Sequence, residues 1–291
     1  MQLSRVRDVI RDQSPLTLPF TATVSDAARL MAKHQTGAIL ITRDGNLEGI
    51  FTERDVSFKV MAASLNPDTT PLHDVMTFNP VTLKPDDTVL GALQKIHAGD
   101  YRHLPVLDEN HLMGVVSVRD IYKYAIAQRE RDMNNLRQAV SLQCTIVPDL
   151  ISKQVIASLE PSATVIDAAQ LMAKRKIGAV LIIQEGALKG IFTERDVSLR
   201  VVAANLNPET TCLNEVMTAD PVTLNYDDKA IDVVQNMQAG NYRHVPVFDG
   251  PDLLGIVSIR DLYGCMESGL EESFRSALYE RAHDMAREGN N

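Results

Sequence analysis

The nine residues Gly-Ile-Phe-Thr-Glu-Arg-Asp-Val-Ser at 49–57 occur again, unchanged, at 190–198. A shift of 141 residues superposes these two stretches and also brings the Tyr-Arg-His at 101–103 onto the Tyr-Arg-His at 242–244. Without any gap, about 58 of the 100 positions in the range 23–122 are identical at this shift. The chain therefore consists of two copies of one module.

A weaker period of 65 residues lies inside each copy. It relates the Gly-Ile-Phe-Thr at 49–52 to the Gly-Val-Val-Ser at 114–117, and it relates Asp55 to Asp120. The chain is thus built from four related repeats of roughly 60 residues. We refer to the residues of about 5–65, 72–127, 147–206 and 213–269 as repeats 1, 2, 3 and 4.

Each repeat shows the same succession of local patterns, illustrated here by repeat 1. A short extended segment precedes apolar residues at helical spacing over 24–31, and the apolar run at 38–41 is typical of a buried strand. A turn at 43–46 leads to a second strand at 47–51, and a second helix is expected to start at 52–55. The predicted unit is βαββα, and the fold class is α+β.

The ends of the first helices can also be predicted. In repeat 2, either Thr88 or Asp86 can cap the helix start, because a side-chain oxygen there accepts a hydrogen bond from an unpaired N–H group. We expect Gly37 in repeat 1 and Gly99 in repeat 2 to end these helices.

The composition excludes several classes of protein. Of 291 residues, 45% are hydrophobic and 23% are charged, which is the globular average and excludes wholesale disorder. Aromatic residues make up 5% and Trp is absent, so aromatic platforms for single-stranded nucleic acid are not expected. The formal net charge of −9 also argues against a nucleic-acid partner, although a local basic pocket remains compatible with it.

The sequence indicates a cytoplasmic protein. It has no run of 18 apolar residues that could span a membrane, and its first residues lack the apolar core of a secretory signal. Cys144, Cys212 and Cys265 are far apart, without a Cys-x-x-Cys pair, which argues against a disulfide framework or a zinc site.

The pattern Thr/Ser-x-Arg-Asp after a glycine and two apolar residues is present in all four repeats. The hydroxyl and the N–H groups of a helix start suit a phosphate, the carboxylate can hold a ribose diol, and the arginine offers a planar fork for phosphate. A helix cap worth about 1 kcal/mol is the alternative interpretation. Four copies favour a ligand site. The residues are Thr52, Arg54 and Asp55; Ser117, Arg119 and Asp120; Thr193, Arg195 and Asp196; and Ser258, Arg260 and Asp261.

A second cationic feature marks repeats 2 and 4 only. Arg102 and His103 stand at the entry of the predicted strand of repeat 2, as Arg243 and His244 do in repeat 4, and these donors could clamp phosphates. The alternative is a surface ion pair of the arginine with a nearby acid such as Asp100.

The period, the order of elements and the four motifs resemble cystathionine-β-synthase (CBS) domains. The resemblance implies two pseudo-twofold CBS pairs that bind AMP, ADP, ATP or S-adenosylmethionine, with or without Mg²⁺, the motif aspartates holding the ribose and the arginines and histidines meeting phosphates. It implies no required cofactor. The implied ligand-binding set around the adenine adds Thr17, Ala38, Ile39, Thr82, Leu104, Pro105, Ser158, Ala179, Thr223, Val245 and Pro246.

The internal repeat sets the domain boundaries. The predicted domains are a first pair at 1–127, a linker helix at 128–146, a second pair at 147–269 and a C-terminal helix at 270–291. The two helices are expected to serve packing or dimer contact, or to dock on another protein. One chain carries two pairs, so either a self-packed disk or a homodimer is expected.

Function is predicted to be regulatory rather than catalytic. The chain has no phosphate-binding Gly-x-x-x-x-Gly-Lys loop, no His-Glu-x-x-His motif and no nucleophile placed beside its histidines, so no catalytic residue and no metal ligand is assigned. We expect a sensor that binds an adenosine-containing ligand and signals to an unidentified regulated protein. The alternatives are a structural adaptor with vestigial sites, a binder of adenosine in RNA or DNA, and an unrecognised nucleotide hydrolase.

Overall fold

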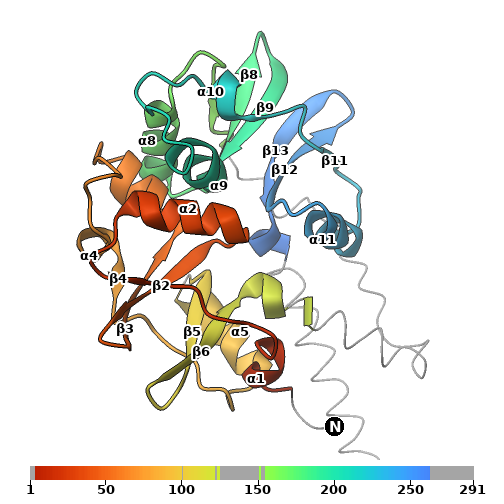
Figure 1. Ribbon diagram of the computed structural model, residues 1–291. Helices are drawn as coiled ribbons and strands as arrows, with labels where there is room; N and C mark the ends of the chain where they lie inside the picture. Colours follow the sequence, from red (N-terminus) through yellow and green to blue (C-terminus); the bar gives the residue numbers. More distant parts are fainter. Residues whose placement is uncertain (1–3, 100, 122, 125–150, 152–154, 263–291) are drawn as a thin grey trace, which may run out of the picture. The chain divides into compact units, whose positions relative to one another are not determined.

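A computed structural model describes residues 4–99, 101–121, 123–124, 151 and 155–262 (Figure 1). The predicted linker helix at 128–146 and C-terminal helix at 270–291 lie outside these residues. The chain divides into two compact units. Among the described residues, the first contains repeats 1 and 2, most of repeat 3 from Ala157, and the start of repeat 4 up to Asp220; the second contains repeat 4 from Pro221. We describe each unit by itself.

Repeat 1 follows the predicted βαββα order. After a short helix, α1, strand β1 runs parallel to β2, and β2 pairs antiparallel with β3. The chain then enters α3, which continues as a π-helix, η1. The elements are α1 (Val6–Val9), β1 (Thr17–Pro19), α2 (Val24–His34), β2 (Ala38–Arg43), β3 (Asn46–Thr52), α3 (Glu53–Asp55) and η1 (Val56–Met61).

Repeat 3 has the same order and the same strand pairing. Its elements are β7 (Ser158–Leu159), α8 (Val165–Arg175), β8 (Ala179–Gln184), β9 (Ala187–Thr193), α9 (Glu194–Asp196) and the π-helix η2 (Val197–Val202).

The sheets of repeats 1 and 3 are each completed by a strand from the start of the next repeat. After α4 (Leu72–Val75), strand β4 (Thr77–Phe78) pairs antiparallel with β3. After α10 (Leu213–Val216), strand β10 (Thr218–Ala219) pairs in the same way with β9. Both sheets therefore have four strands.

Repeats 2 and 4 have smaller sheets. In repeat 2, Leu83 forms a parallel bridge to β5, and a helix begins at residue 118 after β6. In repeat 4, β11 runs parallel to β12, and a helix begins at residue 259 after β13. The elements are α5 (Val89–Ala98), β5 (His103–Asp108), β6 (His111–Ser117), β11 (Leu224–Asn225), α11 (Ala230–Ala239), β12 (His244–Asp249) and β13 (Asp252–Ser258).

Capping residues explain where the first helices begin and end. Thr88 caps α5 and accepts a hydrogen bond from the Gly91 N–H at 3.0 Å, while Gly99 stands at its C-cap, as predicted. The prediction that Gly37 ends α2 is wrong, because Gln35 takes the left-handed conformation there with φ 52°. Its side-chain amide donates to the Ala32 carbonyl at 2.9 Å, which satisfies an oxygen that the helix end leaves unpaired.

The β2–β3 hairpin closes through a two-residue turn at Asp44 and Gly45. Arg43 pairs directly with Asn46, and both turn residues have positive φ, 51° and 82°. A turn of this kind matches the right-handed twist of the strands and favours Asp-Gly.

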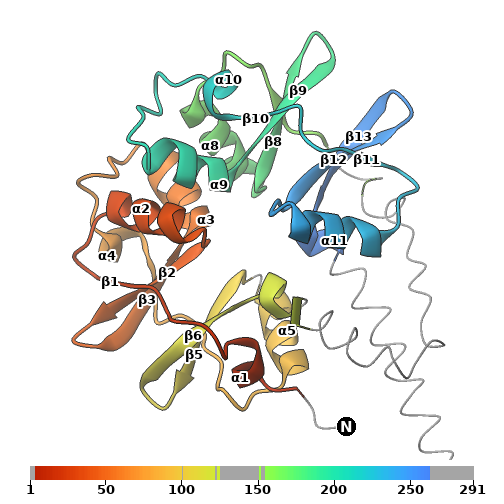
Figure 2. The same cartoon turned by 45° about the vertical axis from the view of Figure 1, so that its right-hand side comes forward.

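Repeats 1 and 3 share one hydrophobic core. Helix α2 packs on η2 and α8 packs on η1, so each repeat's first helix contacts the other repeat's second helix (Figures 1 and 2). The centre contains Met31, Phe51, Met172 and Phe192, all fully buried. The two repeats are therefore joined by side chains that neither could bury alone.

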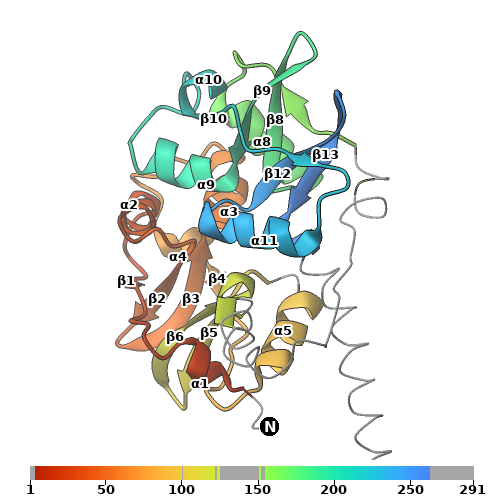
Figure 3. The same cartoon turned by 90° about the vertical axis from the view of Figure 1, so that its right-hand side faces the viewer.

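Repeats 1 and 2 meet through their sheets. Ala38, Leu40 and Ile50 form a buried cluster against which Leu112 and Val115 of β6 pack. Strands β3 and β6 are in contact, as Figure 3 shows. This sheet-to-sheet contact joins the two repeats into a pair.

Candidate functional site

The Thr/Ser-x-Arg-Asp motif forms the same local cap in all four repeats. In each, the aspartate Oδ2 accepts the motif's first backbone N–H at 2.9 Å and the Thr or Ser hydroxyl at 2.6–2.7 Å. The aspartate N–H donates back to the hydroxyl at 3.3–3.4 Å. The capping interpretation is confirmed, and it uses only one of the two carboxylate oxygens.

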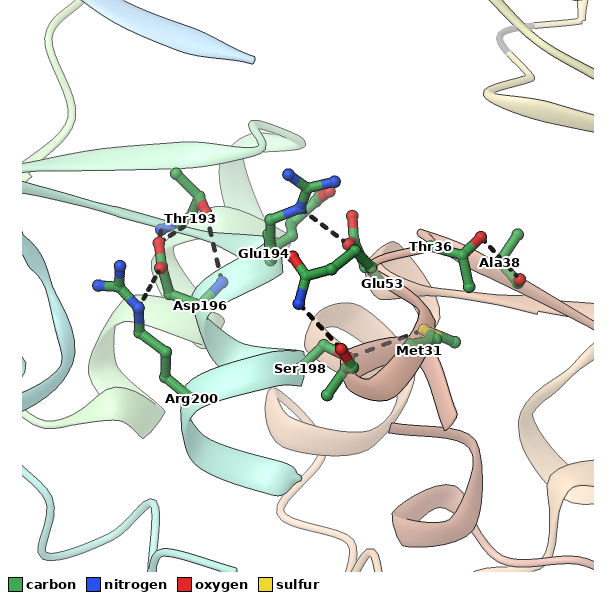
Figure 4. A network of polar contacts seen from close by, with 12 residues as sticks. Met31, Thr36, Ala38, Glu53, Thr193, Glu194, Asp196, Ser198 and Arg200 are labelled. Carbon is green, nitrogen blue, oxygen red and sulfur yellow. Dashed lines mark hydrogen bonds and ion pairs between the residues drawn. The ribbon is translucent and has the colours of Figure 1, made fainter. Parts of the chain in front are cut away.

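In repeats 1 and 3, a cation holds the other oxygen. The Lys59 Nζ lies 2.7 Å from Asp55 Oδ1, and the Arg200 Nε lies 3.2 Å from Asp196 Oδ1 (Figure 4 shows the second pair). Both aspartates are buried. Burial raises the pKa of Asp196, against the lowering by the hydrogen bonds of Thr193 and the charge of Arg200.

In repeats 2 and 4, the equivalent carboxylates are more open. Asp120 and Asp261 are partly exposed, and no ion pair to either is found among the described residues. The residues four positions later are Tyr124 and Cys265, neither of which is a cation. Neither repeat therefore has, four residues after its aspartate, the cation that Lys59 and Arg200 provide in repeats 1 and 3.

Strand register brings the predicted histidines beside the caps of repeats 2 and 4. His103 pairs across the hairpin with Ser117, and His244 pairs with Ser258. At the same register position, repeat 1 has Ala38 opposite its cap threonine. The structure thus joins the two predicted features, the cap and the Tyr-Arg-His, in repeats 2 and 4 only.

Two of the predicted phosphate-binding arginines form ion pairs between repeats. Arg102 of repeat 2 forms a bidentate ion pair with Glu194 of repeat 3. The arginine Nη1 donates to the glutamate Oε2, and the arginine Nη2 donates to Oε1 at 3.3 Å. Arg195 donates from Nε to Glu53 Oε1 at 3.1 Å, between repeats 3 and 1 (Figure 4). Each glutamate side chain is only 3% exposed.

Sequence reasoning missed these glutamates. The motif residue between the hydroxyl and the arginine is Glu53 in repeat 1 and Glu194 in repeat 3, but Val118 and Ile259 in the other two. This alternation of an acid with an apolar residue at one motif position was the signal that could have predicted a separate role for the glutamates. Asp100, the acid considered for Arg102, lies outside the described residues.

Four separate stretches of the chain match the family model of the CBS domain, at residues 6–62, 72–127, 147–202 and 213–268. The chain belongs to the CBS domain family. The fold is α+β with four CBS repeats, as predicted.

Among relatives of the CBS family, the CBS domain-containing protein CBSCBSPB1 of Arabidopsis thaliana is 30% identical over 284 residues, covering 86% of this chain and 51% of its own. The Meiotically up-regulated gene 70 protein of Schizosaccharomyces pombe is 25% identical, and the match covers 88% of this chain and 43% of that protein. The chain spans about half the length of the curated relatives it matches. Neither name is that of an enzyme.

A solved CBS structure has the same fold. Protein MJ1225 of Methanocaldococcus jannaschii, proposed to be an archaeal homologue of g-AMPK, superposes with a TM-score of 0.70 at 20% identity. The match covers 89% of this chain and 98% of that one.

The remaining predicted residues of the CBS repeats differ in accessibility. Ile39, Leu104 and Val245 are core residues with at most 1% exposed, so an adenine could reach them only if the packing opens. Ala38, Pro105, Ala179 and Pro246 are also buried. The accessible members are Thr17, Ser158 and Thr223, which are exposed, and Thr82, Arg54, Arg119, Arg243 and Arg260, which are partly buried.

Two further observations concern the described residues of the CBS chain. None of their helices is both long and apolar enough to cross a bilayer. No three His, Cys, Asp or Glu side chains in this part of the chain gather where they could hold a metal ion.

Proposed function

We propose that the chain is a regulatory sensor that binds an adenosine-containing ligand, AMP, ADP, ATP or S-adenosylmethionine, at CBS repeats 2 and 4. The observation that carries the proposal is the register that sets His103 opposite Ser117 and His244 opposite Ser258. In these repeats a carboxylate, a hydroxyl and an imidazole belong to one short stretch of sheet and helix, and the carboxylate Oδ1 has no ion-pair partner among the described residues. Family membership supports a regulatory rather than a catalytic role.

The chemistry of each group fits one part of such a ligand. The open Oδ1 of Asp120 can accept hydrogen bonds from a ribose diol, while its Oδ2 stays in the cap. Imidazole and guanidinium groups donate to phosphate oxygens, and the imidazole binds them most strongly when protonated. Mg²⁺, if it takes part, would arrive with the phosphates of ADP or ATP.

The signal would pass through Arg102. In the structure this arginine is held by Glu194 of repeat 3, and a phosphate group would compete with that carboxylate for the guanidinium. Ligand binding at repeat 2 would therefore weaken a contact to repeat 3, and the two states would differ in how the repeats are joined. A regulated protein would read this difference.

Calorimetric titration of the full chain with each of the four ligands, with and without Mg²⁺, tests the proposal. We expect saturable binding of at least one ligand, and mass spectrometry should detect the same molecule copurifying with the protein. No heat at millimolar ligand would refute the proposal.

The competition model makes a sharper prediction. Glu194→Gln removes the rival charge, so ligands with phosphate should bind several-fold more tightly, whereas S-adenosylmethionine, which lacks phosphate, should be unaffected. Glu53→Gln is the matched control, because Glu53 pairs with Arg195 rather than with Arg102. Equal effects of the two variants would contradict the model.

A further inference from the structure

We propose that the four motif aspartates divide into two kinds: Asp120 and Asp261 are the carboxylates that take a ligand, whereas Asp55 and Asp196 act as structural ties. This inference rests on the proposed function and names which of its sites are used. It departs from the expectation that all four aspartates play one role. The observation behind it is the cation that follows the aspartate by four residues in repeats 1 and 3 only.

Counting hydrogen-bond partners shows how fully Asp55 is engaged. Its Oδ2 accepts the Thr52 N–H and hydroxyl, at 2.9 and 2.7 Å. Its Oδ1 lies 2.7 Å from the Lys59 ammonium. A ribose diol needs at least two acceptor directions from one carboxylate, and here three donors already converge on a side chain that is only 10% exposed.

The cation is itself fixed from its other side. Lys59 Nζ also donates to the Val75 carbonyl at 2.9 Å and to Thr77 Oγ1 at 3.3 Å. Arg200 in repeat 3 repeats this arrangement, with Nη1 donating to the Val216 carbonyl at 2.9 Å. The carboxylate, the cation and the carbonyl at the end of α4 or α10 form a chain of contacts that ties the π-helix to the segment completing the sheet.

Repeats 2 and 4 have no cation at the position that forms this tie in repeats 1 and 3. Four residues after their aspartates stand Tyr124 and Cys265, and the carboxylates of Asp120 and Asp261 are partly exposed. Only the capping hydrogen bonds to Oδ2 engage them within the described residues. Among the described residues, no cation has to be displaced before their Oδ1 atoms accept new donors.

Four single variants of the full chain test the division: Asp55→Asn, Asp120→Asn, Asp196→Asn and Asp261→Asn. Each is titrated with the ligand that binds the unaltered chain, and its thermal unfolding is recorded. Asp120→Asn and Asp261→Asn should each weaken one class of site by at least about tenfold or remove it from the stoichiometry. Asp55→Asn and Asp196→Asn should keep affinity within about twofold but unfold at lower temperature, because a cap and a tie are lost.

Transplanting the tie gives a test that does not require removal of an aspartate. Tyr124→Lys places a cation four residues after Asp120, and it should weaken binding at repeat 2 by at least about tenfold. Tyr124→Met is the matched control, since it alters the same position without a charge. It should bind as the unaltered chain does.

The outcomes separate two failures. If the unaltered chain binds none of the four ligands, the proposed function fails and this inference fails with it. If the chain binds but Asp55→Asn or Asp196→Asn abolishes a site, or Tyr124→Lys binds as well as Tyr124→Met, the proposed function stands and the division is overturned. Lys59→Met gives a check in a chain that keeps every aspartate: it should lower thermal stability without changing affinity.

Discussion

Repeats 1 and 3 carry the same four-residue cap as repeats 2 and 4, with nearly identical hydrogen-bond lengths, yet its surroundings differ. In repeats 1 and 3 the cap lies at a shared helical core, its aspartate is buried and a glutamate beside it binds an arginine of another repeat. In repeats 2 and 4 the aspartate is partly exposed and a histidine stands opposite the cap. One motif can therefore serve assembly in one place and remain open to a ligand in another.

The largest effect should come from breaking the ion pair between Arg195 of repeat 3 and Glu53 of repeat 1. Arg195→Met leaves Glu53 buried without the arginine that now lies 3.1 Å from it, and loss of one partner of a buried ion pair costs about 3–5 kcal/mol. Urea unfolding followed by circular dichroism should show an earlier midpoint. The double variant Arg195→Met with Glu53→Gln should recover part of the loss, and no recovery would show that the charge of Glu53 is not the cause.

Replacing the motif glycine with alanine should cost more stability in repeat 1 than in repeat 2. A Cβ on Gly49 would lie 2.6 Å from Met76 Sδ and 2.9 Å from the Thr77 carbonyl. On Gly114 it would lie 2.9 Å from Gln13 Oε1, the end of a flexible side chain, and meet no backbone atom this close. Gly49→Ala should therefore lower the free energy of unfolding by about 2 kcal/mol, and Gly114→Ala by less than about 1. Thermal unfolding of both variants measures the two losses of stability. Equal losses would contradict the prediction.

The smallest effect should be the pH dependence of stability that arises from Asp196 in repeat 3. Because burial raises the pKa of Asp196, the folded chain binds a proton there more readily than the unfolded chain does. Its contribution to the free energy of unfolding therefore increases as the pH falls through the raised pKa. Unfolding from pH 7 to pH 4 should show the unaltered chain gaining stability relative to Asp196→Asn.

The control for this pH series is Asp261→Asn, which changes a partly exposed carboxylate at the same motif position. The difference between this variant and the unaltered chain should change less with pH. A larger change for Asp261→Asn than for Asp196→Asn would contradict the assignment.

Local features of the fold were predictable because they depend on near neighbours. Thr88 as a helix cap and Ala38 as a strand start follow from patterns within a few residues. Lys59, four residues after Asp55, could also have been recognised from helical spacing. The pattern showed Gly49 only as the glycine that precedes the motif, whereas the structure gives it a packing role against Met76.

Contacts between distant repeats were not predictable. Arg195 and Glu53 are 142 positions apart, and Arg102 and Glu194 are 92 apart. The pattern of one repeat does not reveal which repeat will lie beside it, so these arginines looked available for phosphate. The shared core of α2 and η2 decides their partners, and that core depends on how whole repeats pack.

The strands β4 and β10 have a consequence for how such a chain can be cut or duplicated. The family match of repeat 1 ends at residue 62, but the sheet of repeat 1 is finished by Thr77 and Phe78, inside the next match. A fragment that stops between the two matches would leave β3 with an unpaired edge, a surface prone to self-association. Gene duplication in steps of 141 residues avoids this break, because each copy brings the closing strand of its own first sheet.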